Sequence, residues 1–410
     1  MHPTKLISFV LPLVIIVTTG SCSSVSKETS AIPPAVGASG GDGGIIIEEP
    51  LTVPGGYPAG QKITIFDKDA VAVAAAYRAL EGNGKFARLK VSYATNRQIK
   101  DDDGKLHYTA ESGDLSFGYC YVSIPKDHRM GEMEAPSKLR FEFKPNPEKH
   151  IVLMSAAKTS REEFFNDINT LLRSTSGSNA FVFVHGFNVT FEDAARRTAQ
   201  MAYDLEFNGV PVFFSWPSQG NIPTYTVDER NIEWAEADLK GFLLDFLRHS
   251  QADNVYVIGH SMGTRALARS IVSIGAEDSV AAKKLKGVIL AAPDIDAVVF
   301  KRDIAPKLIG TGRNVTLYAS SNDRALGLSK KIHGYQRAGE TTGELVIVNG
   351  MDTIDASNVD TSLVGHTYYG DNRSIISDMH YLLKTQLPVK DRAGLSSVGK
   401  EPSLYWIFKP

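Results

Sequence analysis

Residues 254–268 read NVYVIGHSMGTRALA, and this stretch decides the fold. A short apolar run rich in β-branched and aromatic residues predicts a buried strand, and the small and apolar residues at the end recur at helical spacing. Between them, residues 259–263 predict a tight turn that strains the backbone of Ser261 and exposes its hydroxyl above the sheet. Gly259 and Gly263 remove side chains that would collide there. Ser261 is therefore a candidate nucleophile on a strand-to-helix elbow.

The rest of the chain alternates in the same way. Apolar strands are predicted at 181–184, 210–216, 254–258, 287–291, 314–319 and 344–348, and helices at 161–172, 191–207, 231–249, after the elbow to 274, and at 374–383. Upstream, the pattern predicts a helix at 66–80 and strands at 89–95, 117–124, 139–143 and 151–155. Alternating strands and helices predict an α/β fold, a mostly parallel sheet with helices on both faces.

The N-terminus has the pattern of a targeting segment. Lys5 precedes an apolar run, Leu6 to Val17, and small residues then lead to Cys22. Such a run is typical of a signal peptide rather than a membrane span. Small residues followed by Cys resemble a bacterial lipobox, which implies a lipid attached to Cys22, with an ordinary secretory signal as the alternative. Thr19 departs from that motif, in which Leu is usual.

Composition excludes several classes of protein. Hydrophobic residues make up 43% and charged residues 22% of 410 residues, which is normal for a globular chain. A formal net charge of −2 gives no argument for binding nucleic acid. The only cysteine besides Cys22 is Cys120, so no disulfide framework is expected, and Cys120 lies in an apolar strand pattern typical of core residues.

A serine nucleophile needs a general base. His366 lies in a loop after the last predicted strand and before the last predicted helix, where the chain order Ser, acid, His places the base. His380 sits in a helical pattern and His333 in a basic surface turn. We therefore expect His366 to be the base.

The acid has three candidates. Asp323 follows the second strand after the elbow, which is the usual place for it, and Asp294 and Asp296 follow the strand before that one. Asp355 and Asp360 are nearer to His366 in sequence but lie in a loop of undefined path. Asp323 is the first choice, and Asp294 or Asp296 is the alternative.

Two backbone N–H groups are expected to form an oxyanion hole. One belongs to Met262, directly after the nucleophile, and the other to Phe187 in the His-Gly-Phe loop that follows a strand. Further side chains are expected at the rim of the pocket, where strands end: His185, Trp216, Tyr225 and Tyr368. Ser218 to Arg230 is the only lid candidate.

These residues carry a resemblance to a known family. From residue 181 to about 383 the chain resembles the α/β-hydrolase superfamily. The runs FVFVHGFN, FEDAARR, PVFFSWPSQG, GHSMG, LAAPDIDA, LYASSNDRAL and DTSLVGHTYYGD resemble more narrowly a family of uncharacterised bacterial serine esterase/lipase-like hydrolases (DUF900-like), as do SYATNR and YCYVSIPKDHRMGE upstream. The resemblance implies the triad Ser261, Asp323 and His366, and it implies no known substrate.

The sequence therefore predicts an envelope-anchored serine hydrolase acting on small-molecule carboxylic esters, with no metal or cofactor. Ser23 after Cys22 implies an outer-membrane lipoprotein facing the periplasm. The expected parts are a lipoprotein-type signal peptide (1–22), a flexible tether (23–60), an N-terminal extension packing on the sheet (61–160), the catalytic core (161–390) and a C-terminal tail (391–410). The alternatives are a thioesterase, amidase or acyltransferase with the same triad, and a non-catalytic binding or scaffold protein. The oligomeric state is left open.

Overall fold

The computed structural model describes residues 79–81, 84–103, 105–137, 141–175, 177–359 and 373–409. All of them belong to one compact unit, Pro58–Pro410. The other unit, Met1–Tyr57, lies outside the described residues, and so do the signal peptide, Cys22 and the tether. Of the helix expected at 66–80, only Ala79 and Leu80 are described, and they belong to a strand.

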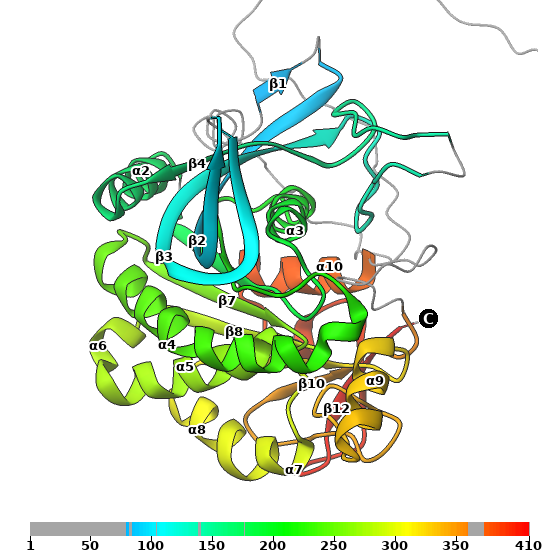
Figure 1. The fold of residues 1–410 in the computed structure, drawn as a ribbon. Helices are drawn as coiled ribbons and strands as arrows, with labels where there is room; N and C mark the ends of the chain where they lie inside the picture. The colour runs from blue at the N-terminus through cyan, green and yellow to red at the C-terminus, as the bar shows by residue number, and fades with distance from the viewer. Residues whose placement is uncertain are drawn as a thin grey trace, which may run out of the picture. The chain divides into compact units, whose positions relative to one another are not determined.

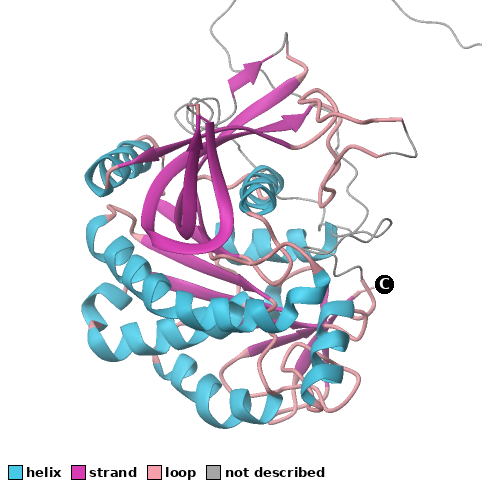
Figure 2. Ribbon diagram, viewed as in Figure 1, coloured by secondary structure: helices cyan, strands magenta, loops and turns pink. Residues whose placement is uncertain are grey.

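Twelve strands of the described chain form one sheet (Figures 1 and 2). Its order is β11-β12-β10-β9-β8-β7-β5-β6-β2-β3-β4, with β1 paired to β2. The strands are β1 (Ala79–Glu81), β2 (Phe86–Asp102), β3 (Lys105–Pro125), β4 (Val152–Thr159), β5 (Asn179–Val184), β6 (Val210–Ser215), β7 (Asn254–His260), β8 (Leu285–Ala291), β9 (Asn314–Ala319), β10 (Asp352–Asp355), β11 (Leu395–Val398) and β12 (Tyr405–Phe408). All pairs from β2/β6 across to β10/β12 are parallel, and the edge pairs are antiparallel.

Helices cover both faces of this sheet (Figure 2). They are α2 (Arg161–Arg173), α3 (Phe191–Asp204), α4 (Tyr225–His249), α5 (Gly263–Glu277), α6 (Ser279–Ala282), α7 (Ala297–Val299), α8 (Ala305–Gly310), α9 (Arg324–His333) and α10 (Arg373–His380), with single 3₁₀ or π turns at Ile222–Thr224, Phe300–Ile304, Tyr381–Thr385 and Val389–Asp391. One apolar core contains side chains of α2, α4, α5 and α8, and the other contains those of α3 and α10. No helix of the described chain is both long and apolar enough to span a bilayer.

The strand before the elbow is buried on both faces. Every residue of β7 from Val255 to His260 is buried, as expected for a central parallel strand covered by helices on each side. The chain turns at Ser261, and α5 begins at Gly263. The expected strand, turn and helix are therefore present, and the α/β fold predicted from the sequence is confirmed.

The upstream segment extends the same sheet. Residues Ser92–Thr95 of β2 pair in parallel with Val212–Ser215 of β6, and β3 and β4 follow in antiparallel order. The β2–β3 hairpin is long, with register irregularities around Arg97. This hairpin brings residues near position 97 to the loop that follows β6.

Two expected strands are wrong. Residues 141–143 form no strand, and Phe141 has a φ of +57°. The apolar run at 344–348 is not a strand either, although Val346 is buried and its neighbours pack on the core. In both cases the pattern of apolar residues indicated a strand that the backbone does not form. At 344–348 the reason is that apolar residues of a loop also pack on the core.

The strands at the C-terminal side of the sheet were missed. The strand expected at 344–348 is replaced by β10, whose sequence is DTID, and the expected tail from 391 contains β11 and β12. β10 pairs in parallel with β9 and β12. Only Ile354 in β10 is apolar, so the hydropathy pattern gave little indication of a strand here. Pairing with the neighbouring strands decides the position of β10.

Candidate active site

Ser261 stands at the apex of the elbow between β7 and α5. Its φ is +47°, a left-handed conformation that is rare for residues other than glycine. The residue is only 2% exposed, so the sequence-based expectation of an exposed hydroxyl is wrong. Its N–H donates to the carbonyl of Ala291 at 2.9 Å. Its own carbonyl accepts from the Thr264 hydroxyl at 2.6 Å and from the Asp294 N–H at 3.2 Å. These bonds hold a strained backbone in place, which is typical of functional positions.

The loop after β5 lies directly against the elbow. A Cβ atom added to Gly186 would lie 2.9 Å from the Cβ of Ser261, and one added to Gly263 would lie 2.2 Å from the carbonyl oxygen of His185. A Cβ on Gly259 would lie 2.8 Å from the end of the flexible Leu267 side chain and 3.2 Å from Cγ2 of Thr264. Glycine at 186 and 263 is therefore what lets the two backbones approach.

The two expected oxyanion donors lie in this contact. Met262 follows Ser261 and is fully buried, and Phe187 follows Gly186. Neither backbone N–H donates a hydrogen bond to any atom of the described residues. Most interior N–H groups in proteins are paired, so two N–H groups without an acceptor among the described residues, beside a strained serine, are able to donate to a ligand oxygen.

The base expected at His366 lies in 360–372, outside the described residues, as does Tyr368. The flanking elements are described: β10 leads into that segment, and α10 follows it. His333, one alternative, bonds Glu229 at 2.7 Å. His260, next to Ser261, is buried and its Nδ1 has no partner in the described chain. Burial lowers the pKa of His260 to about 3, so it has little proton affinity at neutral pH.

Asp323 lies between β9 and α9. Its Oδ1 accepts the N–H of Leu326 at 3.0 Å and so caps α9. The residues before it are tied to the chain after β10: the Ser321 N–H donates to Ser357 Oγ at 2.9 Å, and the Asn322 amide donates to the Ser357 carbonyl at 2.8 Å. Asp323 therefore stands beside the strand end from which the chain continues to His366.

The alternative acids have other roles. Asp294 is 1% exposed, and both of its oxygens are occupied, by Arg337 and Ser329 on one side and by Arg265 and Tyr225 on the other. Asp296 caps α7 by accepting the N–H groups of Val298 and Val299. A carboxylate offers about four acceptor positions, so Asp294 has none left to orient a histidine. This geometry favours Asp323 among the three.

His185 and Trp216 are not at a rim. Both are fully buried, and their rings stack with centroids 5.0 Å apart. Trp216 Nε1 donates to the His185 carbonyl at 2.8 Å. Burial, and then the nearby charge of Arg97, lower the pKa of His185 to about 3 and keep the ring neutral. The two rings support the His-Gly-Phe loop from below, because strand-end side chains here turn into the core.

Tyr225 is also interior, at 3% exposure. Its hydroxyl donates to Asp294 at 2.5 Å, and its ring packs edge-on against Phe187 at 5.0 Å. The lid candidate 218–230 is tied to the body, since Ser218 Oγ accepts from the Val189 N–H at 3.1 Å and the Ser218 carbonyl accepts from Arg97 at 3.0 Å. The described contacts make this segment a wall of the site.

One positioning residue was missed from the sequence. Arg97 of β2 is 2% exposed, and its guanidinium donates to Val189 O, Ser218 O and Ser215 Oγ at 2.8, 3.0 and 2.8 Å. Ser215 Oγ in turn contacts His185 Nε2 at 3.2 Å. The only signal was a lone Arg in the run SYATNR, one of the runs that carry the family resemblance.

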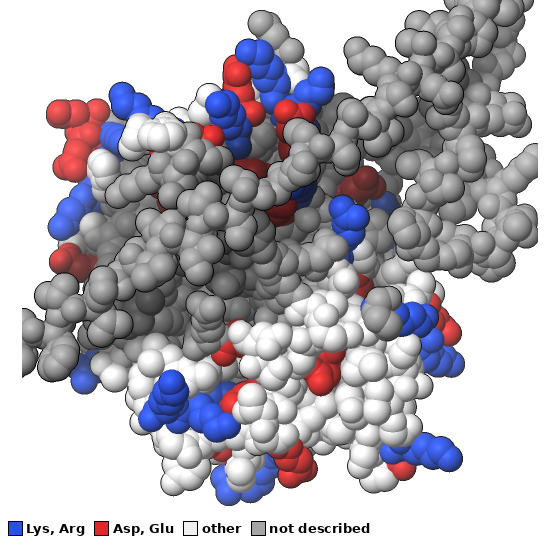
Figure 3. Space-filling view, turned by 90° about the vertical axis from the view of Figure 1, so that its right-hand side faces the viewer, with Lys and Arg blue, Asp and Glu red and all other residues white. Residues whose placement is uncertain are grey.

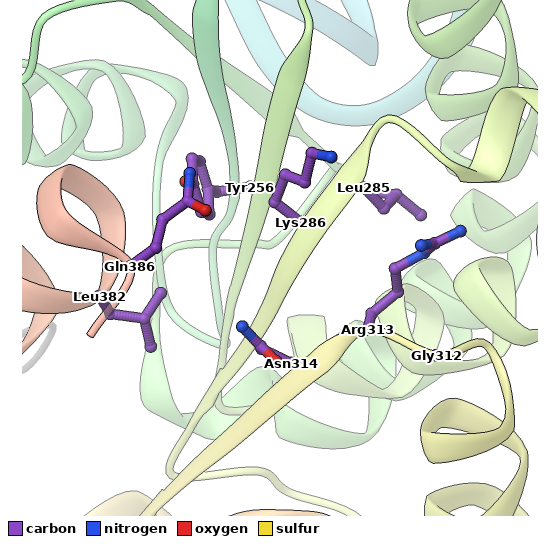
Figure 4. A pocket seen from close by; sticks show the side chains of 8 residues that line it. All are labelled: Tyr256, Leu285, Lys286, Gly312, Arg313, Asn314, Leu382 and Gln386. Carbon is purple, nitrogen blue, oxygen red and sulfur yellow. The ribbon is translucent and has the colours of Figure 1, made fainter. Parts of the chain in front are cut away.

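A separate hollow lies at the other end of the strands. It has a volume of about 230 Å³ and is lined by Tyr256 near the start of β7, by Lys286 and Asn314 at the starts of β8 and β9, and by Gln386 among others (Figure 4). Ser261 follows the opposite end of β7, so this hollow is not the elbow site. In the described part of the chain, no group of three or more His, Cys, Asp or Glu side chains is arranged to hold a metal ion.

Comparisons with solved structures give distant likenesses. An uncharacterised protein from Bacillus cereus is 12% identical over 51% of this chain and 60% of its own, with a TM-score of 0.32. A predicted CIB-like hydrolase from Thermoplasma acidophilum is 11% identical over 63% and 86%, with a TM-score of 0.26. LpqC, a poly(3-hydroxybutyrate) depolymerase from Bordetella parapertussis, is 11% identical over 79% and 96%, with a TM-score of 0.30. This chain thus spans 60% of the length of the first protein.

No curated protein matches the chain. A family match covers the elbow, the loop after β5 and the segment between β10 and α10. It extends over residues 160–385, 226 of the 410 residues, and the family is described as an alpha/beta hydrolase of unknown function. With the strained Ser261 and the parallel sheet in place, the chain belongs to this α/β-hydrolase family, DUF900.

Proposed function

We propose that the chain is a serine hydrolase that cleaves carboxylic esters. The observation that carries the proposal is the elbow: Ser261 has a φ of +47° beside the N–H groups of Met262 and Phe187, which donate to no described residue. A strained serine next to two unused donors has no evident structural purpose, and the arrangement suits acyl transfer.

The proposed reaction uses the sequence-predicted triad, of which His366 lies outside the described residues. His366 takes the Ser261 proton as Oγ attacks the ester carbonyl carbon, and the negative oxygen accepts from Met262 and Phe187. Asp323 orients and stabilises the imidazolium. The C–O bond then breaks, the alcohol leaves with the proton from His366, and an acyl-enzyme remains. Water, deprotonated by His366, attacks the acyl carbon; the acid product leaves and Ser261 regains its proton.

A thioesterase, amidase or acyltransferase would use the same residues. The triad therefore supports acyl transfer in general, and cleavage of an oxygen ester is the more specific part of the proposal. The segment 218–230 is held to the body by Val189 and Arg97, which favours small or medium acyl groups over long chains. We also propose that the protein is attached to the bacterial envelope through a lipid on Cys22, at the outer membrane facing the periplasm. Mass spectrometry of the mature N-terminus tests this, since an unmodified Cys22, or one removed by cleavage, contradicts it.

A fluorophosphonate probe tests for the nucleophile in the full chain. Wild-type protein should be labelled, and Ser261→Ala and His366→Ala should not. Ser155→Ala and His107→Ala are matched controls, because both residues are exposed on strands outside the site, and both variants should label normally. A folded wild type that takes no label contradicts the enzyme proposal and supports a non-catalytic scaffold.

A substrate panel then separates the bonds. p-Nitrophenyl esters of increasing acyl length, the matching thioesters and the anilides are compared by kcat/KM. Faster cleavage of short oxygen esters supports the proposal. A preference for thioesters or anilides would agree with the proposed triad but would show that the enzyme cleaves a thioester or amide bond instead of an oxygen ester.

A further inference from the structure

The connection between β3 and β4 exposes two phenylalanine side chains. Phe141 is 83% exposed and Phe143 is 74% exposed, the two highest values among large hydrophobic residues of the described chain. Met130, in the same connection, is 39% exposed. Single exposed apolar residues need no explanation, but neighbouring exposed aromatic residues indicate a contact surface. In Figure 1 this connection runs out from the sheet on the side of β1.

The structure holds these rings outward. Glu142, between them, turns inward and accepts from His150 Nε2 and the Ser137 N–H, each at 3.2 Å. Its own N–H donates to the Ser137 carbonyl at 3.0 Å. Phe141 has a φ of +57°, which is costly for a bulky residue. The inward Glu142 and the left-handed Phe141 together keep the aromatic side chains in solvent.

The base of the connection is firmly attached. His128 bonds Asp204 of α3 at 2.8 Å, and Arg196 of the same helix donates to the Ile151 carbonyl at 2.7 Å. The exposed rings therefore stand on an anchored loop, so that their exposure is a property of the folded protein.

The charges of this loop favour an anionic partner. Lys144 and Lys149 are exposed, and neither forms an ion pair with a described residue. Of the carboxylates closest in sequence to these lysines, Glu142 is engaged by His150 and Glu148 by Lys85 at 3.1 Å. Asp127, Glu132 and Glu134 lie earlier in the same connection. Figure 3 shows the side of the molecule that lies to the right in Figure 1, and where grey residues do not cover this side, cationic and anionic side chains are interspersed. Lysines that form no ion pair with a described residue, close in sequence to exposed aromatic rings, are typical of a segment that lies in a membrane interface.

The loop also lies where the described chain begins. Lys85, four residues after β1, binds Glu148, and the Lys85 carbonyl accepts from the Lys126 N–H at 2.9 Å. The 78 residues before Ala79 contain Cys22, the proposed lipid attachment site.

We propose that Phe141 and Phe143, with Lys144 and Lys149, dock onto an anionic phospholipid surface, the two rings entering the interface and the two lysines binding lipid headgroups. The contact is independent of hydrolase activity, and it would add to a lipid anchor by setting the orientation of the folded unit on the bilayer.

The test uses the full chain with Cys22→Ser, so that no lipid is attached and the buried Cys120 is the remaining thiol. Phe143→Cys carries an environment-sensitive fluorophore, and Val280→Cys, a position 72% exposed on α6, is the matched control. With vesicles containing about 30% phosphatidylglycerol, the label at 143 should shift to the blue and resist an aqueous quencher, while the label at 280 should not. Equal behaviour of the two labels overturns the proposal.

Measured affinities for vesicles distinguish the contribution of the phenylalanines from that of the lysines. Phe141→Ser with Phe143→Ser should weaken binding about tenfold or more, and Val280→Ser with Val298→Ser should not. All four side chains are exposed, and thermal unfolding checks that each double variant folds. Residues 6–17 are the same in every variant, so an effect of that apolar run cancels. Unchanged affinity of the phenylalanine variant overturns docking, and equal binding to phosphatidylcholine vesicles overturns the role of the lysines.

Discussion

The Nη2 of Arg97 donates a 2.8 Å hydrogen bond to the carbonyl oxygen of Val189, across 92 positions of sequence. Val189 closes the loop that contains Gly186 and Phe187, so a residue of the upstream hairpin holds the loop expected to bind the oxyanion. The Nε of Arg97 also binds Ser215, which contacts His185. The upstream segment therefore contributes to the geometry of the site as well as to the sheet.

Arg97→Lys should lower kcat for a p-nitrophenyl ester about 10- to 100-fold and change KM less than about threefold, because lysine cannot make the forked contacts and the oxyanion loop loses its register. Steady-state kinetics and thermal unfolding are measured together. Arg88→Lys, at the other end of the same strand, is the control and should retain its kcat. A folded Arg97→Lys protein with wild-type kcat would contradict the positioning role.

Ser261→Gly should be more stable than Ser261→Ala, although both are inactive. Glycine tolerates a φ of +47° and alanine does not. The difference in the free energy of unfolding should be about 0.5–1 kcal/mol. It is the energy that alanine loses in the left-handed conformation, reduced by the greater entropy of glycine in the unfolded chain. Urea unfolding measures it. If Ser261→Ala is as stable as Ser261→Gly, the elbow stores no strain.

Asp323→Asn and Asp294→Asn should fail in different ways. Asparagine still caps a helix, so Asp323→Asn should fold normally and lose activity by a factor on the order of 10²–10⁴, as an orienting acid does. Asp294→Asn leaves Arg265 and Arg337 without their buried carboxylate and should destabilise the fold by about 3–5 kcal/mol.

Kinetics combined with chemical denaturation separate the two effects. Normal activity of Asp323→Asn would remove Asp323 as the acid. Full stability of Asp294→Asn would mean that the buried network around Arg265 contributes little.

Deprotonation of His128 should lower the free energy of unfolding at alkaline pH. Burial alone would lower its pKa, but hydrogen bonds to Asp204 and Glu134 outweigh burial and raise the pKa to about 9. Since this value lies above that of an unfolded histidine, about 6.5, the stabilisation is complete below pH 6.5 and is lost as the pH rises through 9. The loss is on the order of 3 kcal/mol.

The measurement is the free energy of unfolding between pH 6 and pH 10 for wild type and His128→Gln. The wild type should decline more steeply, and the two curves should converge at high pH. Parallel curves would mean that His128 is not charged in the folded protein.

The sequence by itself determined the elbow, the parallel core and the order of its strands and helices. These depend on local properties: the period of apolar residues, the glycines at 259 and 263, and strands long enough to be apolar throughout, such as β5 and β7. Local signals failed at Leu345 and its neighbours, which are apolar without being a strand, and at β10, which is a strand with one apolar residue.

Only the tertiary structure decided what the polar residues at the strand ends do. In sequence, Asp294 and Asp323 are each a carboxylate just past a strand, and only the order of the strands made Asp323 the first choice. Folding surrounds Asp294 with two arginines, a tyrosine and a serine, while Asp323 caps α9 beside the end of β10. His185 and Trp216 likewise turn inward, and Arg97 reaches a loop 92 positions away. Burial and hydrogen-bond partners are set by segments distant in the chain, and no local pattern encodes them.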